Sequence, residues 1–429
     1  MDAADLDHRH RTYDGWIPPT VAALLHEHGH HGILRDAAAG GDWFCAHRLA
    51  EAAVDQAPGG QVAALALLEP FAGTGWWLAV STVAGLLAEW EMTDEAIALL
   101  RPLADTGNRE AVRELARLLA GQGHIDRVVA LLGPRSADRS LASELVELTV
   151  GRDRDAEIAA LLPAVGVGAT DPFESRVTDA WDTVPLHAVL LERQGRIDEA
   201  AALLGRHVHV NGVMYADHAE QLARLLARHG RETELRAFTV EGGEEYALSA
   251  LTEFLEEQGR IPEAVALLQE PAGTGNPHAA FHLAELLARH GRQDEAVEVL
   301  RPVAESAGGD SDWIIHLLCR IIVDAGRADE ALTYVDDYFA RRGGNRHEQA
   351  LARAYVLKRC GRAAEADAEL APFARLDENL LHEGTVRGAI AFAERLVRQG
   401  EPQKAIAHLR DRLDGAKVLR RENLRQSDV

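Results

Sequence analysis

The chain has 429 residues, of which 47% are hydrophobic and only 5% are aromatic. This composition excludes wholesale disorder and predicts a core of Ala, Leu and Val, a mixture that favours helices over sheets. The formal net charge of −23 at pH 7 excludes general attraction to nucleic acid or anionic membranes unless a local basic patch intervenes. Heavy use of Ala, Gly and Arg beside only three lysines indicates a GC-rich bacterial genome, such as that of an actinobacterium.

The cysteines predict a reducing, cytoplasmic setting. Cys45, Cys319 and Cys360 are far apart and form no CxxC pair, so they do not predict a disulfide framework. We expect Cys45 and Cys319 to be buried thiols on apolar helix faces. The first residues contain no apolar segment typical of a secretion signal. No apolar run approaches the roughly 18 residues that cross a bilayer.

A turn that begins with glycine recurs along the chain and divides it into repeats of about 34 residues. Its clear copies are GHIDRV (123–128), GRIDEA (195–200), GRETEL (230–235), GRIPEA (259–264), GRQDEA (291–296), GRADEA (326–331) and GRAAEA (361–366). Weaker copies begin at Gly151 and Gly400, an early copy centres on Gly29, and degenerate copies lie near Gly59 and at Glu91.

Each repeat is predicted to be a pair of helices. An apolar pattern of helical period precedes each turn glycine, as in residues 279–287. The glycine is expected to adopt the left-handed C-cap conformation, and the acidic residues after it suit the positive end of the second helix. We expect that helix to end at Arg-Pro, as at Arg101–Pro102 and Arg301–Pro302, or at a Thr-Gly or Gly-Gly turn.

These units resemble the tetratricopeptide repeat. When the turn glycine is placed at the fifteenth position, the family's small residue at the twentieth position corresponds to Ala200, Ala264, Ala296, Ala331 and Ala366. The Leu–small pair at the seventh and eighth positions corresponds to Leu115–Ala116, Leu222–Ala223 and Leu283–Ala284. The family's early Trp is Ala in several units, so the chain is a divergent member. The resemblance implies an all-α, right-handed α-solenoid of about twelve antiparallel helix pairs, a superhelix.

The predicted organisation has three parts. Residues 1–18 form an N-terminal arm, residues 19–414 form the repeat array, and residues 415–429 form a C-terminal cap or tail with an excess of basic residues. The array is irregular near 163–185, where Gly and Pro punctuate a longer interval, and near 205–216, where apolar and polar residues alternate. Such insertions often lie on the binding face of a repeat protein.

Residues 26–30 spell HExxH, the signature of zinc peptidases. That chemistry needs two histidines one turn apart on an unbroken helix. Here Gly29 takes the turn position, and residues 24–29 align with 225–230 and 286–291, which are ends of repeat helices. The sequence therefore favours a His-rich helix end, with no cofactor expected. An alternative metal site at His26, His28 and His30, next to His31, is left open.

The resemblance implies a concave groove lined by the first helix of each pair. The side chains at the second, fifth, sixth and ninth repeat positions would face it. In this chain they include Glu110, Arg113, Arg117, Asp217, Glu220, Arg224, Tyr246, Glu253, His278, His282, Glu285, Trp313, His316, Arg320, Glu348 and Tyr355. The aromatic members, with Phe281, form a candidate row of anchors over four successive units. The charged members have mixed sign.

The leading functional hypothesis is a non-enzymatic scaffold that binds a protein or peptide partner, and neither nucleic acid nor a membrane. The sequence contains no GxSxG, no Walker A motif and no dinucleotide-binding GxGxxG. One alternative is a regulatory or sensory module whose solenoid flexes on peptide binding. Another is a metal-dependent enzyme that uses the His-rich turn or the irregular loops. A third is a homo-oligomer with Trp76 or Trp77 at the contact, because adjacent residues cannot share one helix face.

Overall fold

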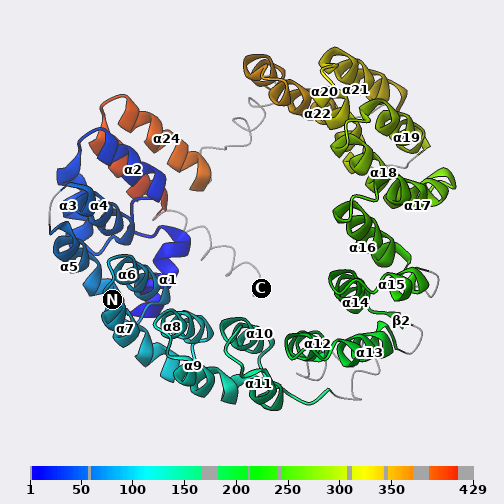
Figure 1. Cartoon of the computed structure of the whole chain (residues 1–429). Coiled ribbons are helices and arrows are strands. Elements are labelled where there is room, and N and C mark those ends of the chain that lie inside the picture. Colours follow the sequence, from blue (N-terminus) through cyan, green and yellow to red (C-terminus); the bar gives the residue numbers. More distant parts are fainter. Residues whose placement is uncertain are drawn as a thin grey trace, which may run out of the picture. The chain divides into compact units, whose positions relative to one another are not determined.

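The computed structural model describes residues 2–56, 59–165, 182–210, 213–239, 244–306, 312–342, 346–370 and 386–413. The chain forms two compact units. Unit 1 comprises Met1–Gly151 together with Asn379–Val429, and unit 2 comprises Arg152–Glu378. Each unit is a stack of helix pairs, which confirms the predicted all-α, TPR-like repeat (Figure 1). The predicted tail, residues 415–429, lies outside the described residues.

Unit 1 opens with a helix where the sequence predicted an arm. This helix, α1 (Ala3–Thr12), buries Leu6, and Trp16 and Ile17 are buried just after it. The stack then continues through α2 (Pro19–Glu27), α3 (His31–Ala39), α4 (Trp43–Gln56), α5 (Gly60–Ala72), α6 (Trp77–Glu89), α7 (Thr93–Asp105), α8 (Arg109–Gly121), α9 (Ile125–Leu132), a single 3₁₀ turn (Gly133–Arg135) and α10 (Arg139–Leu148).

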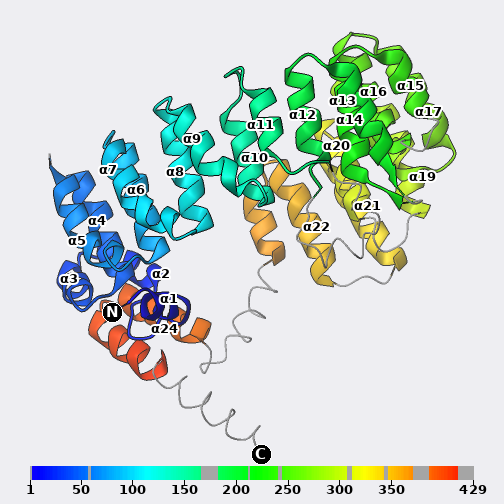
Figure 2. The same ribbon diagram turned by 90° about the horizontal axis from the view of Figure 1, so that it is seen from below.

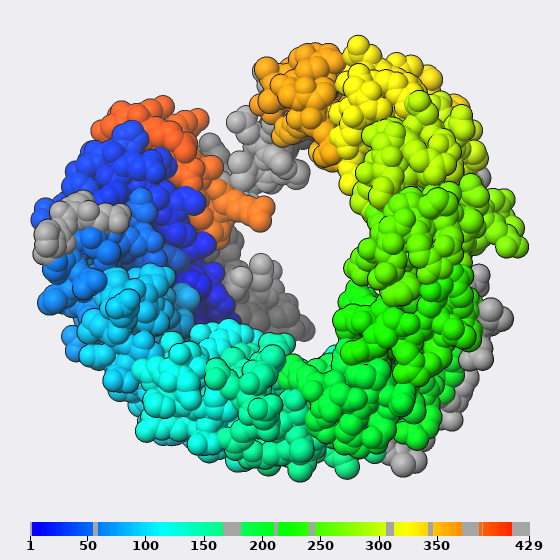
Figure 3. Space-filling view, in the orientation of Figure 1, coloured from blue at the N-terminus to red at the C-terminus, as the bar shows by residue number. Residues whose placement is uncertain are grey.

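The last helix pair in the described part of the chain covers the first repeat of unit 1. This pair consists of α24 (Val386–Arg398) and the helical residues 402–413, and we call it the C-terminal hairpin. Helix α24 packs against α2, and two views show them side by side (Figure 2). In the space-filling view the atoms of the hairpin lie directly on those of the first helices (Figure 3). The hairpin thus covers an apolar face that a terminal repeat would otherwise expose.

One apolar cluster joins these two ends of the chain. It is made of buried side chains from α2 to α4 and the segment before them, together with buried side chains from the C-terminal hairpin. Its buried members are Ile17, Val21, Ala22, Leu25, Leu34, Cys45, Ala393, Leu396, Val397, Ala405, Ile406, Leu409 and Leu413. More than half of this cluster therefore comes from residues far downstream of the repeat that they cover.

Unit 2 continues the repeat with one small sheet inserted. Its elements are α11 (Asp155–Leu161), α12 (Val184–Arg193), α13 (Ile197–Val208), β1 (His209–Val210), β2 (Val213–Met214), α14 (Ala216–Arg228), α15 (Glu232–Phe238), α16 (Glu244–Glu257), α17 (Ile261–Gly273), α18 (Pro277–Arg289), α19 (Gln293–Ser306), α20 (Asp312–Asp324), α21 (Ala328–Arg342), α22 (Arg346–Arg359) and the helical residues 363–370. Strands β1 and β2 are antiparallel, with His209 opposite Met214.

The two stretches predicted to be irregular have different outcomes. In the stretch 205–216, α13 continues to Val208, and the alternating residues after it form the β1–β2 hairpin. A helix therefore occupies the first part of a segment that the alternation marked as non-helical. Most of the other stretch, residues 166–181, lies outside the described residues, and α12 begins at Val184.

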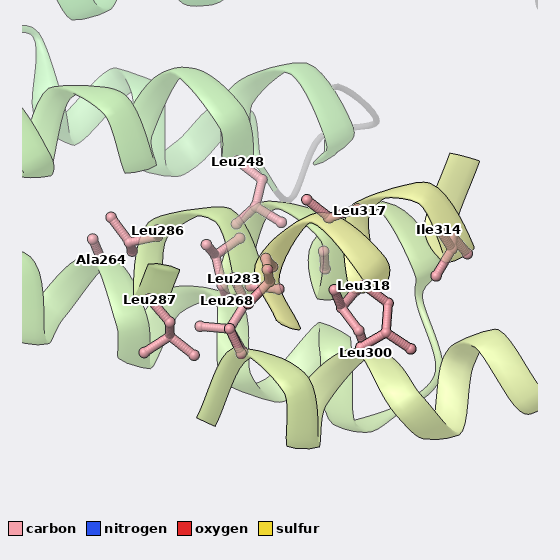
Figure 4. Packing of buried hydrophobic residues seen from close by; sticks show 14 of the residues in the cluster. Leu248, Ala264, Leu268, Leu283, Leu286, Leu287, Leu300, Ile314, Leu317 and Leu318 are labelled. Atoms are coloured by element: carbon pink, nitrogen blue, oxygen red, sulfur yellow. The ribbon is translucent and has the colours of Figure 1, made fainter. Parts of the chain in front are cut away.

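The core of unit 2 follows the predicted repeat positions. Leu268 of α17, Leu283 and Leu287 of α18 and Leu300 of α19 are buried members of one apolar cluster (Figure 4). The alanines at the twentieth repeat position are all fully buried: Ala200, Ala264, Ala296, Ala331 and Ala366. A methyl group at this position lets the second helix of a pair lie close to the first, which is the packing reason for a small residue there.

Four second helices run through a proline instead of ending at it. Pro70, Pro102, Pro271 and Pro302 lie inside α5, α7, α17 and α19. The prediction that these helices end at Arg101–Pro102 and Arg301–Pro302 was wrong. Proline removes one backbone hydrogen bond, but each of these prolines lies within about one turn of the helix end. The final turn is held by burial, because Ala104 and Ala304 are fully buried.

The turn glycines adopt the predicted left-handed backbone. Those with positive φ include Gly29, Gly59, Gly123, Gly151, Gly195, Gly230, Gly259, Gly291, Gly326, Gly361 and Gly400. In the degenerate turn between α6 and α7, Glu91 takes this conformation with φ of 63°. The same capping bonds form there, since the Met92 N–H donates to the Leu87 carbonyl at 2.8 Å. The conformation is therefore imposed by the helix end and not by the residue type.

Replacing Glu91 with Gly should stabilise unit 1. A left-handed backbone costs a residue with a Cβ about 1–2 kcal/mol, while Gly loses about 0.5–1 kcal/mol more entropy on folding. We expect a net gain of about 0.5–1 kcal/mol, measured by chemical denaturation. Gly123→Ala is the reciprocal variant, because Gly123 has φ of 76° and an added Cβ would meet nothing within 4 Å. It should lose a similar amount, and equal stability of both variants with the parent would contradict this account.

Candidate functional site

The predicted groove residues lie in both units, and each unit is described by itself. Glu110, Arg113 and Arg117 lie on α8 of unit 1. The other thirteen lie on α14, α16, α18, α20 and α22, the even-numbered helices of unit 2. Within unit 2 these helices form one row and the odd-numbered helices form the other (Figure 1). We call the surface formed on α16, α18, α20 and α22 by the predicted positions and by the thirteenth position of each repeat the even-helix face.

Aromatic rings connect α18 and α20 on the even-helix face. The Trp313 ring stacks on His278, with centroids 5.5 Å apart and planes at 22°. Phe281 meets Trp313 edge-on at 5.2 Å. Trp313 still exposes 37% of its surface. Neighbouring rings therefore hold this side chain in place and leave part of it open to solvent.

A second ring contact connects α20 and α22. His316 and Tyr355 meet edge-on at 5.3 Å, and Tyr355 is also 37% exposed. Tyr246 of α16 is partly buried and packs against the core of unit 2. The structure thus brings four of the predicted residues, His278, Trp313, His316 and Tyr355, into ring contacts across three helices. With Phe281 they form what we call the aromatic row.

His282 lies beside this row and is half-buried. Burial lowers the pKa of His282, and the nearby carboxylates of Glu285 and Glu253 only partly oppose that effect. The Phe281 ring touches it edge-on at 5.6 Å. His282 is therefore a neutral ring at neutral pH, which extends the weakly polar surface of the aromatic row along α18.

The arginines of the even-helix face are paired with carboxylates of the same or a neighbouring helix. Arg320 reaches Glu285 at 2.6 Å, and a pocket of about 240 Å³ lies beside them between α18 and α20. Arg359 forms two bonds of 2.8 Å with Asp324. On α14, Arg224 bonds Glu220 of its own helix at 2.6 Å, and Asp217 is exposed. The mixed charges predicted from the sequence are therefore largely ion pairs.

Ion pairs at the repeat turns were not predicted. In the Gly259 turn, Arg260 bonds Glu263 three residues later and Glu232 of the preceding repeat, with shortest distances of 2.7 Å to each. Hydrogen bonds from Arg260 and Arg236 lower the pKa of Glu232 to about 2. Equivalent local pairs are Arg196–Glu199, Arg231–Glu234, Arg292–Glu295, Arg327–Glu330 and Arg362–Glu365. The recurring Arg-x-x-Glu of the turn sequences was the available signal.

Glu144 of unit 1 is the largest feature that the sequence analysis missed. Its side chain is only 5% exposed, and it accepts from Arg113 at 3.2 Å and from Arg117 at 2.7 and 3.1 Å. Glu144 occupies the eighth position of its repeat, where the family has a small residue. Two predicted groove arginines are thus committed to a buried carboxylate, while Glu110 on the same helix is exposed. The sequence feature that could have revealed this site is a Glu at a repeat position that usually holds a small residue.

A buried histidine fixes the start of α14 next to the small sheet. The His218 imidazole bonds Asp182 at 2.6 Å and the His207 carbonyl at 2.8 Å, and Tyr215 stacks on it at 5.4 Å. Burial opposes the charge on His218, but the hydrogen bonds with Asp182 and His207 prevail and raise its pKa. The pKa of Asp182 is lowered despite burial, because His218 donates to it. Each group therefore stabilises the charged form of the other.

The His218 pair should make stability depend on pH. A histidine whose pKa is higher in the folded state than in the unfolded state stabilises the fold. This stabilisation is complete below the unfolded-state pKa of about 6.5, and it is lost as the pH rises through the folded-state pKa. We expect the difference in unfolding free energy between the parent and His218→Phe to shrink from pH 6 toward pH 9. Paired denaturation curves measure it. A difference that grows over this range would show that the histidine is neutral in the folded protein.

The His-rich turn does not form a peptidase motif. Helix α2 ends at Glu27, Gly29 has φ of 76°, and α3 begins at His31. The two histidines of HExxH are therefore on different segments. The His26 ring contacts His31 at 4.8 Å. Throughout the described ranges, no group of three or more His, Cys, Asp or Glu side chains is arranged to hold a metal, so His26, His28 and His30 form no such site.

The remaining predicted features have structural roles. Cys45 and Cys319 are buried as expected, and burial raises the pKa of both thiols, that of Cys319 to about 12. Trp76 is buried at the N-cap of α6, while Trp77 in the first turn is partly exposed. The two adjacent tryptophans therefore differ in burial. No helix in the described part of the chain has both the length and the apolarity to cross a bilayer.

Comparison with known proteins gives distant likenesses. No protein-family model and no curated protein matches the sequence. A structure of Naa15/Naa10 bound to HypK-THB has a TM-score of 0.40 at 16% identity and covers 90% of this chain and 61% of that one. A tetratricopeptide repeat protein from Parabacteroides merdae ATCC 43184 gives 0.28 at 12% identity, covering 64% and 98%. Pentatricopeptide repeat protein PPR10 from maize gives 0.30 at 19% identity, covering 83% and 53%.

The chain thus spans less than two thirds of the length of two of these three structures. All three TM-scores lie below 0.5, and the repeat architecture is established by the helix pairs themselves.

Proposed function

We propose that the protein is a non-enzymatic scaffold whose even-helix face binds a segment of a partner protein. One observation carries this proposal: the aromatic row leaves Trp313 and Tyr355 each 37% exposed on neighbouring helices. Tryptophan and tyrosine supply a large share of binding energy at protein interfaces when they fill a partner's surface. A scattered exposed apolar residue needs no explanation, but two half-exposed rings that each contact a ring of a neighbouring helix do.

The surroundings of the row support rigid recognition. The rings are held by His278, Phe281 and His316, so little side-chain freedom is lost when a partner covers them. Arg320 and Arg359 are already bonded to carboxylates, so their positions are fixed before binding. A face that is ordered in advance spends less of its interaction energy on ordering during association.

Trp313→Ala combined with Tyr355→Ala should abolish partner binding. Each residue is expected to contribute at least tenfold to affinity, since hot-spot aromatics cost about 2 kcal/mol or more when truncated. The wild-type protein is used to capture partners from an extract of the source cells, and each captured protein is then purified and titrated by calorimetry. The control is Val62→Ala with Val150→Ala, two exposed apolar residues of unit 1.

The outcomes separate the hypotheses. A purified partner that binds the wild type and the control but not the aromatic variant supports the proposal. A partner whose affinity is equal for all three proteins contradicts it and moves the binding site elsewhere. Nuclease treatment of the extract tests nucleic acid as the ligand, because loss of capture after that treatment would also contradict a protein partner.

A further inference from the structure

We infer that the segment bound by the even-helix face is basic, with Lys or Arg side chains set among apolar ones. This inference rests on the proposed function. It follows from which charges on the face are already neutralised and which are not, and from the chemistry of the exposed rings.

The cations of the face are occupied by the protein's own carboxylates. Arg320 is bonded to Glu285, Arg289 to Glu256 at 2.6 and 3.0 Å, and Arg359 to Asp324. An acidic segment would need unpaired arginines or lysines at the ninth and thirteenth repeat positions of α16 to α22. To bind the arginines that are present, an acidic segment would have to break their ion pairs. The released carboxylates of this protein would then face the carboxylates of the segment.

Three carboxylates of the same face are not occupied in this way. Glu253, Glu257 and Glu348 are exposed, and no described residue forms an ion pair with them. They lie on α16 and α22, on either side of the rings of α18 and α20. A fourth carboxylate, Glu245, lies 3.4 Å from His278. The face therefore offers negative charge on its first and last helices, beside the aromatic row, and a basic segment would meet each group with opposite charge.

The exposed rings also suit cations. A guanidinium or ammonium group over the face of Trp or Tyr is attracted by the ring's electron distribution. This chain already uses that contact, since the Arg301 guanidinium lies 5.9 Å from the Tyr334 ring and that of Arg395 lies 4.9 Å from Phe392. The rings of the aromatic row could accept both the apolar stems and the charged ends of Lys and Arg. The overall charge of −23 would speed the approach of such a segment.

The test is a selection of binding peptides from a random-sequence display library at low salt. The bait is the full-length protein, and the competitor is the Trp313→Ala, Tyr355→Ala variant. We expect the peptides that require the two rings to be enriched in Lys or Arg beside apolar residues. Their affinity, measured on synthetic copies, should fall at least tenfold in the Glu253→Gln, Glu257→Gln, Glu348→Gln variant and should fall with added salt.

A matched variant controls for total charge. Glu270→Gln, Glu298→Gln and Asp337→Asn remove three exposed carboxylates from α17, α19 and α21, the odd-numbered helices. This variant should bind the selected peptides as the wild type does. Ring-dependent peptides that are acidic, or that bind both charge variants equally well, would overturn a basic ligand but leave the proposed function standing. If no selected peptide depends on the two rings, both fail.

Discussion

Val397→Asp is expected to release the C-terminal hairpin and destabilise unit 1 by several kcal/mol. Val397 lies in α24, has no exposed surface and belongs to the cluster that joins α24 to α2. A carboxylate placed there has no cation in the cluster, and a buried unpaired charge costs several kcal/mol. The folded chain can avoid this cost by undocking the hairpin, but it then exposes Val21 and Leu25 to water.

Two measurements distinguish undocking from general unfolding. Hydrogen exchange should accelerate in α2 and α24 while the amides of unit 2 keep their protection. Chemical denaturation should show the loss of stability in unit 1. Ala391→Asp is the control, since Ala391 is an exposed residue of the same helix. If both variants were as stable as the parent, α24 would not be docked on α2.

The packing within each helix pair could be predicted from the sequence because the sequence pattern repeats. Each turn glycine, each Ala at the twentieth position and each Leu pair acts within one helix pair, so about 34 residues contain the whole signal. The docking of Val397 near Val21 has no such signal, because it joins residues at opposite ends of the chain. An apolar stripe on α24 predicts that one face of this helix is buried. The pattern does not identify the surface against which that face packs.

The electrostatics of the candidate site could not be predicted from the sequence. The repeat register predicts Trp313 and Tyr355 at groove positions, and in the structure each ring contacts a histidine of a neighbouring helix. Whether Arg320 is free or paired depends on the helix beside it, where Glu285 occupies the matching position. A single repeat does not contain that information. The mixed charges therefore appeared to be available for a ligand, although most of them are used within the array.

The turn ion pairs contribute little to stability. Arg260 is about a third exposed, and ion pairs near the surface contribute little individually. Their geometric effect is larger than their energy, since one arginine links the start of its own helix to the preceding repeat. These contacts set the register between neighbouring helix pairs in unit 2.

Removing both arginines from Glu144 is expected to cost about 3–5 kcal/mol, the loss typical of a buried charge deprived of its partners. The variant is Arg113→Met with Arg117→Met, in which methionine keeps most of the aliphatic stem that each arginine packs along α8. Glu144 would then remain 5% exposed without either of its cations. Denaturation of unit 1 measures the loss.

Adding Glu144→Leu to this double variant should recover most of the lost stability. With all three charges gone, α8 and α10 would meet through apolar side chains, and replacing a buried ion group by packed apolar residues is often neutral or stabilising. Failure of the triple variant to recover would show that the arginine stems, and not the charge of Glu144, hold the two helices. Recovery would show that Arg113 and Arg117 are required by a buried Glu at a position that ordinarily holds a small residue. Pairing with Glu144 would then be sufficient to explain why Arg113 and Arg117 occur at predicted groove positions of unit 1, without a ligand.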